Sequence, residues 1–465
     1  MSVNSLFDIG STSLRAVGEK IDATSQNIAN AESEGYRRRR VSLSSRSVAA
    51  TGLYASNGAQ DVTSSGVGVE QFERVRDGML VSARNDAQSG ESDAREEGRV
   101  LGVLEGALAT DTDAGLSASL QGLADGFSNL ANNPESQGVR ESVLGRARQL
   151  TDTFGRLDQR LGELTTNTEN ALASNVEKAN GLLDKVASLN EQIESARAGG
   201  SPDYAAEDQR DQTVKELSKL LPVDPQENRS DGYTLTVDGM TVVQGDDATA
   251  LSLENENDPS KAPTVEFGDT GVAFEPGDES GGEIGAQTRL LNDTLPGVQG
   301  KLDALADEVL QKVNGEHTAG YDQNGGTGEN FFVDKSGTTG NTAGNIELNV
   351  DGPEDIAAVA GDGSGNPLPG DTGPAQNIAD VASDLTTGAT DLAAGVGTQV
   401  QEAAAKEEAQ AAVGERVQAQ IEDVSGVSVD QQLSSLIEQQ QQFAASAQVL
   451  TTAREVSSTL LSIAR

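Results

Sequence analysis

This 465-residue chain has 74 carboxylate side chains, so a catalytic carboxylate pair cannot be told from solvated surface, and no other catalytic or metal-binding pattern is complete. The single histidine, His317, follows a predicted helix, where a lone histidine is usually a C-terminal cap or a surface residue. The chain has no cysteine and no second histidine that could complete a transition-metal site. Asp322-Gln323-Asn324 is similar to the start of a calcium loop, but the closing glutamate is missing at its spacing. We therefore predict no catalytic residue, no metal and no cofactor.

The most concentrated charge in the chain is a run of four arginines at residues 37–40. Such a run is typical of a nucleic-acid site, but ion pairing with acidic neighbours in an assembly explains it equally simply. The whole chain has 33 basic and 74 acidic residues, a formal net charge of −41, and a chain this negative repels nucleic acid and anionic membranes. We therefore favour ion pairing, and we expect neither nucleic acid nor a membrane as a partner.

The acidic composition and the lack of targeting segments indicate in which medium and compartment the protein is expected. Salt screens the self-repulsion of a highly charged chain, so one hypothesis is adaptation to high salt, and the alternative is an acidic protein that is merely soluble. The chain does not start with a basic region followed by an apolar run, as a secretory signal does, and no stretch is long and apolar enough to span a bilayer. Taken alone, these absences indicate the cytoplasm, although they leave open an export route that reads an unfolded N-terminus.

The two ends of the chain are predicted to form the helices around which the rest is organised. Apolar residues recur every three or four positions between residues 424 and 465, and a second stripe with this period runs from residue 2 to about residue 30. This spacing places each set along one side of a helix. Two such helices are expected to pair as a coiled coil that closes the chain on itself or on neighbouring copies. The N-terminal stripe contains Val3, Leu6, Leu14, Val17, Ile21 and Ile28, and the C-terminal stripe contains Leu433, Leu436, Phe443, Ala447, Leu450, Ala453, Val456, Leu460 and Ile463.

Between these ends, the sequence predicts a mainly helical body with one β insert. Helical periodicity is found at residues 72–108, 116–130, 139–198, 208–221, 283–313 and 378–421. Residues 222–281 instead alternate apolar and polar side chains around Asp238-Gly239, which is a strong signal for a β-hairpin. Residues 66–69 are expected to form a turn that leads into a strand.

The predicted fold class is mainly α with a β insert (α+β), elongated and multi-domain, with long coiled-coil-like helices, paired terminal helices and discontinuous domains. Hydrophobic residues make up only 35% of the chain and aromatic residues 3%, which fits thin layers and an assembly that buries surface between subunits. The expected domains are a terminal assembly domain (1–45 and 424–465), a mainly helical body (46–221 and 282–423, with a Gly-rich β segment near 324–373) and a small outer β domain (222–281).

Several motifs carry a resemblance to a known family. Asn27-Ile28-Ala29-Asn30, followed after four residues by Gly35-Tyr36, resembles the N-terminal signature of bacterial flagellar axial proteins, the proteins of the rod, the hook and the hook-associated segments. Residues 440–453 resemble the C-terminal signature of the same group. Four internal motifs, in family order along nearly the whole chain, resemble the hook-associated protein 1 family. They are Leu130-Ala131-Asn132-Asn133-Pro134, Asp208-Gln209-Arg210-Asp211, Gly281-Gly282-Glu283-Ile284-Gly285, and Val313-Asn314 with His317 and Gly320-Tyr321-Asp322.

The resemblance implies an extracellular structural protein at the hook–filament junction that allows the filament to assemble on the hook. The implied partners are other copies of itself in a ring, hook protein, hook-associated protein 3, and an export chaperone at the C-terminal region. The resemblance also implies export through the flagellar type III apparatus without a cleaved signal peptide, and terminal segments that become ordered on assembly. The chain departs from the family in its more basic arginine run and in its short outer part.

The residues implied to make the assembly contacts combine the two stripes with the N-terminal signature. They are Leu14, Val17, Ile21, Asn27, Ile28, Asn30, Gly35 and Tyr36 at the N-terminal end, together with the nine residues of the C-terminal stripe. Two alternatives stay open. A flagellar hook or distal rod protein shares both ends, although bodies in those families are mainly β. A cation-dependent enzyme or an acidic surface protein is an alternative that rests on acidity alone.

Overall fold

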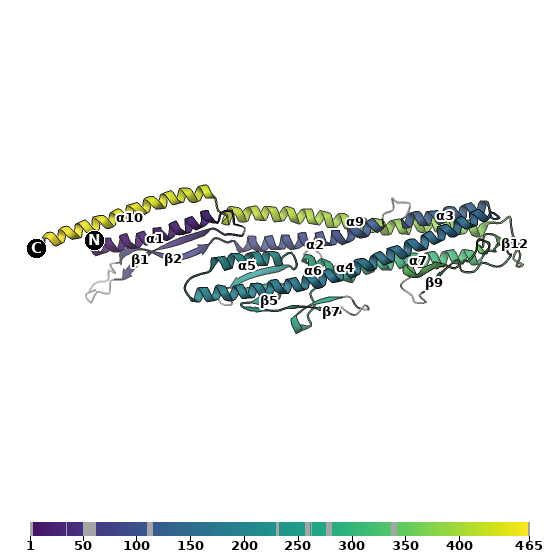
Figure 1. Cartoon of the computed structure of the whole chain (residues 1–465), viewed down its shortest axis with the longest axis horizontal. Coiled ribbons are helices and arrows are strands. Elements are labelled where there is room, and N and C mark those ends of the chain that lie inside the picture. Colours follow the sequence, from purple (N-terminus) through teal and green to yellow (C-terminus); the bar gives the residue numbers. More distant parts are fainter. Residues whose placement is uncertain are drawn as a thin grey trace. The chain divides into compact units, whose positions relative to one another are not determined.

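The computed structural model describes residues 3–33, 35–49, 62–108, 115–228, 232–255, 261, 263–275, 281–335 and 342–463 (Figure 1). Its longest helices are α4 (Gln137–Ala198), α9 (Gly373–Ser425), α10 (Val429–Ile463) and α2 (Gly78–Leu108). The shorter helices are α1 (Val3–Ala29), α3 (Leu116–Asn132), α5 (Tyr204–Leu217), α6 (Gly282–Arg289), α7 (Leu295–Thr318) and α8 (Thr342–Asn345). The strands form separate small sheets, so the predicted class, mainly α with a β insert, is confirmed.

The chain folds into two compact units, each made of segments that are far apart in the sequence. The terminal unit consists of Met1–Asn85, Lys185–Lys215 and Ala412–Arg465, and the body unit consists of Asp86–Asp184 and Glu216–Ala411. Both ends of the chain therefore belong to the same unit. The division into three domains, with residues 222–281 as a separate outer domain, stays a prediction.

In the terminal unit, α1 and α10 lie side by side and run in opposite directions (Figure 1). Ser13 Oγ lies 2.9 Å from Ser446 Oγ, and nearer the start of α10 Gln439 Nε2 donates to Thr24 Oγ1 over 3.0 Å. The pairing of the two terminal helices, which the matching stripes predict, is confirmed.

A long β-hairpin packs against α1 in the same unit. It consists of β1 (Arg39–Ala49) and β2 (Val62–Arg74), which pair in antiparallel fashion with irregularities in register. Residues 66–69 lie inside β2, so the turn predicted there is wrong. Glycine is present at position 66 for a different reason. Gly66 has φ +106°, and a side chain at this position would collide with Thr12 of α1.

The start of α2 also differs from the prediction. Helical periodicity at residue 72 suggests a helix there, but Phe72 belongs to β2 and pairs with Val41 across the hairpin. Asp77 ends the intervening loop, and its Oδ1 accepts a hydrogen bond from Met79 N over 3.0 Å. Because an Asp side chain at this position satisfies a free N–H of the first turn, the helix begins at Gly78.

The predicted β insert is a set of short antiparallel strands in the body unit. The four strands β3 (Val223–Asn228), β4 (Gly232–Val237), β5 (Met240–Gln244) and β6 (Asp247–Ala248) form one sheet in that order, and β7 (Leu251–Glu254) pairs with β8 (Thr264–Phe267). The predicted hairpin at Asp238-Gly239 joins β4 to β5 and is confirmed. Both residues have positive φ, 50° and 77°, as a type I′ turn requires.

Long helical segments predicted between the two ends of the chain also form. The long helix predicted at residues 139–198 is α4, and the helix predicted at 283–313 is α6 and α7 joined by a π-helical turn at Leu290–Thr294. Short strand pairs follow α7. They are β9 (Phe332–Asp334) with β10 (Ile346–Leu348), and β11 (Ala360–Gly361) with β12 (Pro367–Leu368).

His317 lies in the core of the body unit, so its expected place at a cap or on the surface is wrong. The residue is 0% exposed, and its ring lies beside that of Phe331 with the centroids 5.1 Å apart. Ala357 N donates to Nε2 over 2.9 Å, so Nε2 carries no hydrogen and Nδ1 donates to the Glu329 carbonyl oxygen over 2.6 Å. Burial lowers the pKa of this imidazole, which joins three stretches of backbone in its neutral form.

Candidate assembly surface

The described residues contain no group of three or more His, Asp or Glu side chains placed to bind a metal ion, and none of their helices is long and apolar enough to cross a membrane. Two other features of the terminal unit stand out. One is the set of exposed apolar side chains on α10, and the other is a polar network where the chain leaves α1.

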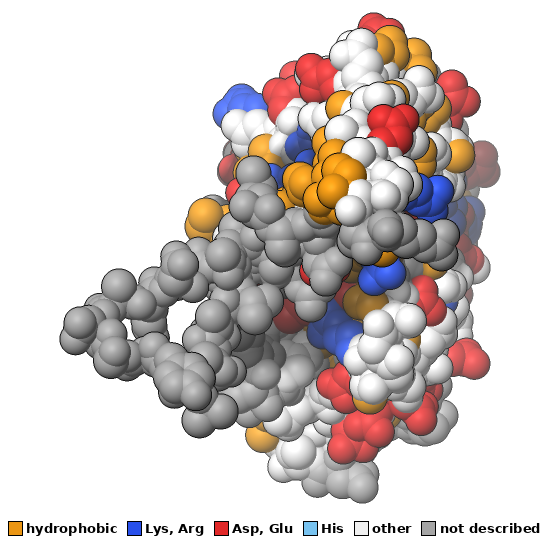
Figure 2. Space-filling view, turned by 90° about the vertical axis from the view of Figure 1, so that its left-hand side faces the viewer, with side chains coloured by type: hydrophobic (Ala, Val, Ile, Leu, Met, Phe, Trp, Pro, Cys, Tyr) orange, Lys and Arg blue, Asp and Glu red, His pale blue; other side chains and the backbone are white. Residues whose placement is uncertain are grey.

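Helix α10 presents one side to α1 and leaves the other open. On the side toward α1, Gln432 and Ala453 are buried, and Leu450 packs so closely on Gly10 that a Cβ on this glycine would lie 2.8 Å from Leu450 Cγ. The helix also carries large apolar side chains that are 40% or more exposed, namely Val429, Leu433, Ile437, Phe443, Val449, Val456, Leu460, Leu461 and Ile463. Figure 2, which turns the left-hand side of Figure 1 toward the viewer, shows hydrophobic side chains open on the surface.

Charge is scarce on this helix. Only four of its 35 residues are charged, namely Asp430, Glu438, Arg454 and Glu455. An exposed apolar surface rimmed by uncharged polar residues is typical of a site that binds another protein. The open side of α10 is therefore the candidate assembly surface of the terminal unit.

The structure brings together only part of the predicted contact set. Buried members are Val17, Asn27 and Ala453; half-buried members are Leu14, Ile21, Ile28, Asn30, Gly35, Tyr36, Leu436, Ala447 and Leu450; exposed members are Leu433, Phe443, Val456, Leu460 and Ile463. The C-terminal stripe does not form one buried seam with α1, because positions three and four residues apart drift around a straight helix. The part of these residues in assembly stays a prediction.

Asn27 is the centre of the polar network. Its Nδ2 donates to the Arg39 carbonyl oxygen over 2.9 Å and to Gln432 Oε1 over 3.1 Å. Its Oδ1 accepts from Arg39 N over 2.8 Å and from the Tyr36 hydroxyl over 3.0 Å. All four hydrogen-bonding positions of the amide are used, so this one side chain fixes α1, the start of β1 and α10 together.

Gly35 completes the turn that brings Tyr36 back to Asn27. It has φ +81°, and a side chain at this position would collide with Gln212 of α5. Glycine adopts positive φ without a steric penalty. The signature residues Asn27, Gly35 and Tyr36 are thus structural parts of one turn in this chain.

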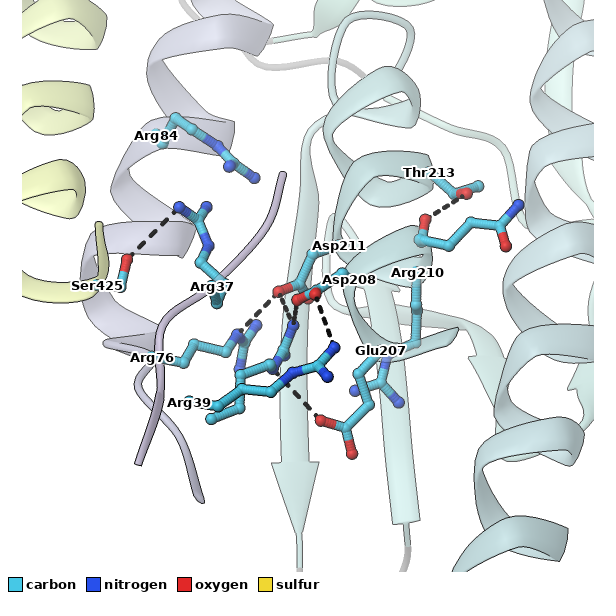
Figure 3. Close-up of polar contacts among 12 residues, drawn as sticks. Arg37, Arg39, Arg76, Arg84, Glu207, Asp208, Arg210, Asp211, Thr213 and Ser425 are labelled. Atoms are coloured by element: carbon cyan, nitrogen blue, oxygen red, sulfur yellow. Dashed lines mark hydrogen bonds and ion pairs between the residues drawn. The ribbon is translucent and has the colours of Figure 1, made fainter. Parts of the chain in front are cut away.

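A cluster of ion pairs follows the turn (Figure 3). Arg74 Nη1 lies 2.9 Å from carboxylate oxygens of both Asp208 and Asp211, and its Nε lies 3.3 Å from Glu207. Arg39 adds a pair to Asp208 at 3.9 Å. The motif at residues 208–211 therefore anchors α5 to the strands of the hairpin.

The two aspartates of this cluster respond differently to burial. Burial raises the pKa of the Asp208 carboxyl, and the favourable contacts with Arg74 and Arg39 do not outweigh it. Burial also acts to raise the pKa of Asp211, but Arg74, Arg76 and Arg210 outweigh it, so this pKa is lowered. Of these two aspartates, Asp211 is the one that the surrounding arginines hold in its ionised form.

The other arginines of residues 37–40 also have partners within the chain. Arg38 Nη2 donates to the Val424 carbonyl oxygen over 3.0 Å, and Arg38 N donates to the Ser425 carbonyl oxygen over 2.9 Å. Cationic groups at the last carbonyls of a helix are favourable, and these carbonyls end α9. Arg40 pairs with Glu73 at 3.0 Å. The predicted ion pairing thus occurs within one chain for Arg39 and Arg40, while Arg38 binds backbone.

Comparisons with known proteins match both parts of the chain. The model of the helical domain of flagellar hook-associated protein FlgK matches residues 101–332, and the model of the C-terminal region of flagellar basal body rod FlgEFG proteins matches residues 420–463. The chain is 29% identical over 347 residues to flagellar hook-associated protein 1 of Salmonella typhimurium, covering 71% of this chain and 59% of that protein. It is 26% identical over 356 residues to the protein of the same name from Bacillus subtilis, covering 70% and 69%.

A solved structure, the flagellar hook junction protein FlgK from Burkholderia pseudomallei, is similar with a TM-score of 0.47 at 23% identity, covering 54% of this chain and 46% of that one. The paired terminal helices and the matched families define an axial structural protein of the bacterial flagellum. The chain belongs to the family of flagellar hook-associated protein 1. The match to the Salmonella protein spans 59% of that relative's length.

Proposed function

We propose that this chain forms the junction between the flagellar hook and the filament and allows the filament to assemble on the hook. The observation that carries the proposal is the open side of α10, which exposes large apolar residues on a helix with four charges. The names of the relatives, flagellar hook-associated protein 1, support a place next to the hook. No catalytic step is part of this function.

In the proposed assembly, copies of the chain form a ring in which the open side of α10 packs on neighbouring copies. Burying one Leu, Ile or Phe side chain stabilises a contact by roughly 1.5–3 kcal/mol. Hook protein lies on one side of the ring and hook-associated protein 3 on the other. Before assembly, the chain leaves the cell through the flagellar type III apparatus without a cleaved signal, with an export chaperone on its C-terminal region.

Substitutions on α10 test this assembly. Phe443 and Leu460 are 43% and 53% exposed, so Phe443→Ser and Leu460→Ser remove apolar surface without opening the core of the chain. We expect the double variant to lose self-association, measured by sedimentation velocity, while its melting temperature stays unchanged. Gln441→Ser, at an exposed polar position of the same helix, is the matched control. Unimpaired association of the double variant would contradict assembly through this side of α10.

A further inference from the structure

The net charge of the chain is divided very unequally between its two units. The terminal unit has 17 basic and 21 acidic residues, which gives −4, whereas the body unit has 16 basic and 53 acidic residues, which gives −37. Even if every basic residue of the body unit neutralised one carboxylate, 37 carboxylates would be left. Several arginines of the terminal unit, by contrast, pair with its own acids, as Arg74 does with Glu207, Asp208 and Asp211.

Internal ion pairs leave the net charge of the body unit at −37, and two of its arginines are already shared between carboxylates. Arg95 pairs with both Glu91 and Glu407, and Arg289 lies within 4.0 Å of Glu97 while it also pairs with Asp93. The remaining carboxylates include exposed residues along the two longest helices. Among them are Glu141, Glu177 and Asp184 on α4, and Asp384, Asp391 and Glu408 on α9.

The two units therefore have opposite effects on self-association. The open side of α10 attracts other copies through apolar contact, which salt does not weaken. The body units repel one another, and this repulsion reaches as far as the Debye length, about 10 Å at 0.1 M salt and about 3 Å at 1 M. An assembly brings many body units near one another, so the electrostatic repulsion between body units grows with each added copy.

We propose that cations gate the self-association of this chain: the terminal units associate only when a dense layer of cations screens the carboxylates of the body units. This inference rests on the proposed function, because it concerns the same assembly. The fold of a single chain does not require so many carboxylates, and this proposal gives them a role in assembly. The expected medium for assembly is one of high ionic strength.

A graded set of variants tests the proposal. Replacing the six carboxylates Glu141, Glu177, Asp184, Asp384, Asp391 and Glu408 by the matching amides changes the net charge from −41 to −35, and replacing them by Lys changes it to −29. Repulsion between two copies scales with the product of their charges, so the lysine variant retains about half of the original repulsion and the amide variant roughly three quarters. We expect the KCl concentration at half-maximal association of the full chain to fall in that order.

Three results are informative. A salt midpoint that falls from the wild type to the amide variant and by about twofold in the lysine variant supports the proposal. Association at the same KCl concentration in all three proteins, or association independent of KCl, would overturn the gating and leave the proposed function intact. Absence of association at every KCl concentration would overturn both. Circular dichroism at each concentration verifies that the helices persist, and sucrose in place of KCl shows whether charge screening is the cause.

Discussion

Tyr36 donates its hydroxyl hydrogen to Asn27 Oδ1 over 3.0 Å, and this bond closes the turn by which the chain leaves α1 and enters β1. The same Asn27 side chain reaches Gln432, which lies 405 residues further along the chain on α10. One buried amide thus joins the beginning and the end of the sequence.

Replacing Asn27 is expected to weaken the terminal unit. Asn27→Ala leaves the backbone of Arg39 and the buried Gln432 without their partner, so we expect a loss of about 2–3 kcal/mol in the free energy of unfolding. Hydrogen exchange of the α1 amides measures it. Asn30→Ala is the control, because the Asn30 amide donates to Gln26 O at an exposed site, and we expect a change within ~0.5 kcal/mol. Equal effects of both substitutions would contradict the central role of Asn27.

Two glycines of α1 are expected to respond in opposite directions to the same substitution. A Cβ at Gly10 would lie 2.8 Å from Leu450 Cγ, whereas a Cβ at Gly18 meets nothing within 4 Å. Gly18→Ala should stabilise α1 by roughly 0.5–1 kcal/mol through helix propensity. Gly10→Ala should not show this stabilisation, because the added methyl group pushes α10 away from α1. Adding Leu450→Ala to Gly10→Ala should restore part of the lost stability. The measurement is the melting temperature of the wild type, the two single glycine variants and the double variant. Equal stabilisation by both alanines would show that Leu450 does not pack on Gly10.

Arg74 is expected to be the most sensitive member of the ion-pair cluster. Arg74→Met leaves the carboxylates of Glu207, Asp208 and Asp211 without their shared partner in a place where each is nearly buried. Breaking a buried pair in this way costs about 3–5 kcal/mol. Arg40→Met, at the exposed pair with Glu73, should leave the stability almost unchanged, because exposed ion pairs contribute little. Urea unfolding compares the two, and a similar small loss for both would contradict a stabilising cluster.

The cluster also predicts how acid acts on the terminal unit. The pKa of Asp211 is lowered in the folded chain, so its contribution is complete above the unfolded value of about 3.9 and is lost as the pH falls from there toward the folded pKa. In Arg74→Met this pKa should rise. Nuclear magnetic resonance titration of the Asp211 carboxyl carbon measures the change, and an unchanged midpoint would show that Arg74 does not hold the carboxylate ionised.

His317 makes the body unit sensitive to mild acid. Burial lowers the pKa of the folded imidazole below the unfolded value of about 6.5, so its stabilisation is complete above that value and is lost as the pH falls toward the folded pKa. The slope in this window is about 1.4 kcal/mol per pH unit. His317→Gln does not titrate, so its deficit against the wild type should shrink from about pH 7.5 to about pH 5.5. Parallel stability curves would contradict the neutral, buried state of His317.

The features that could be predicted from sequence are those fixed by local periodicity. A helix as long as α4 repeats its apolar pattern through 62 residues, and Asp238-Gly239 specifies its turn through two positive φ angles. The start of α2 could not be predicted, because a few apolar residues near Phe72 fit a strand and a helix equally well and the pairing with Val41 decides between them.

Features that depend on residues far apart in the sequence could not be predicted from local sequence patterns. The burial of His317 depends on Glu329 and Ala357, which other segments bring to it. The four hydrogen bonds of Asn27 depend on Arg39, Tyr36 and Gln432. The terminal stripes predicted that α1 and α10 pair, but not which side of α10 stays open, because apolar residues lie on more than one side of this helix.

Electron microscopy of cells that lack this chain, with a blot of the growth medium for flagellin, tests the proposed function most directly. A hook–filament junction protein predicts complete hooks without filaments and flagellin released into the medium. Missing hooks would instead indicate a hook or rod protein, and flagella of normal appearance would contradict a structural role at the junction.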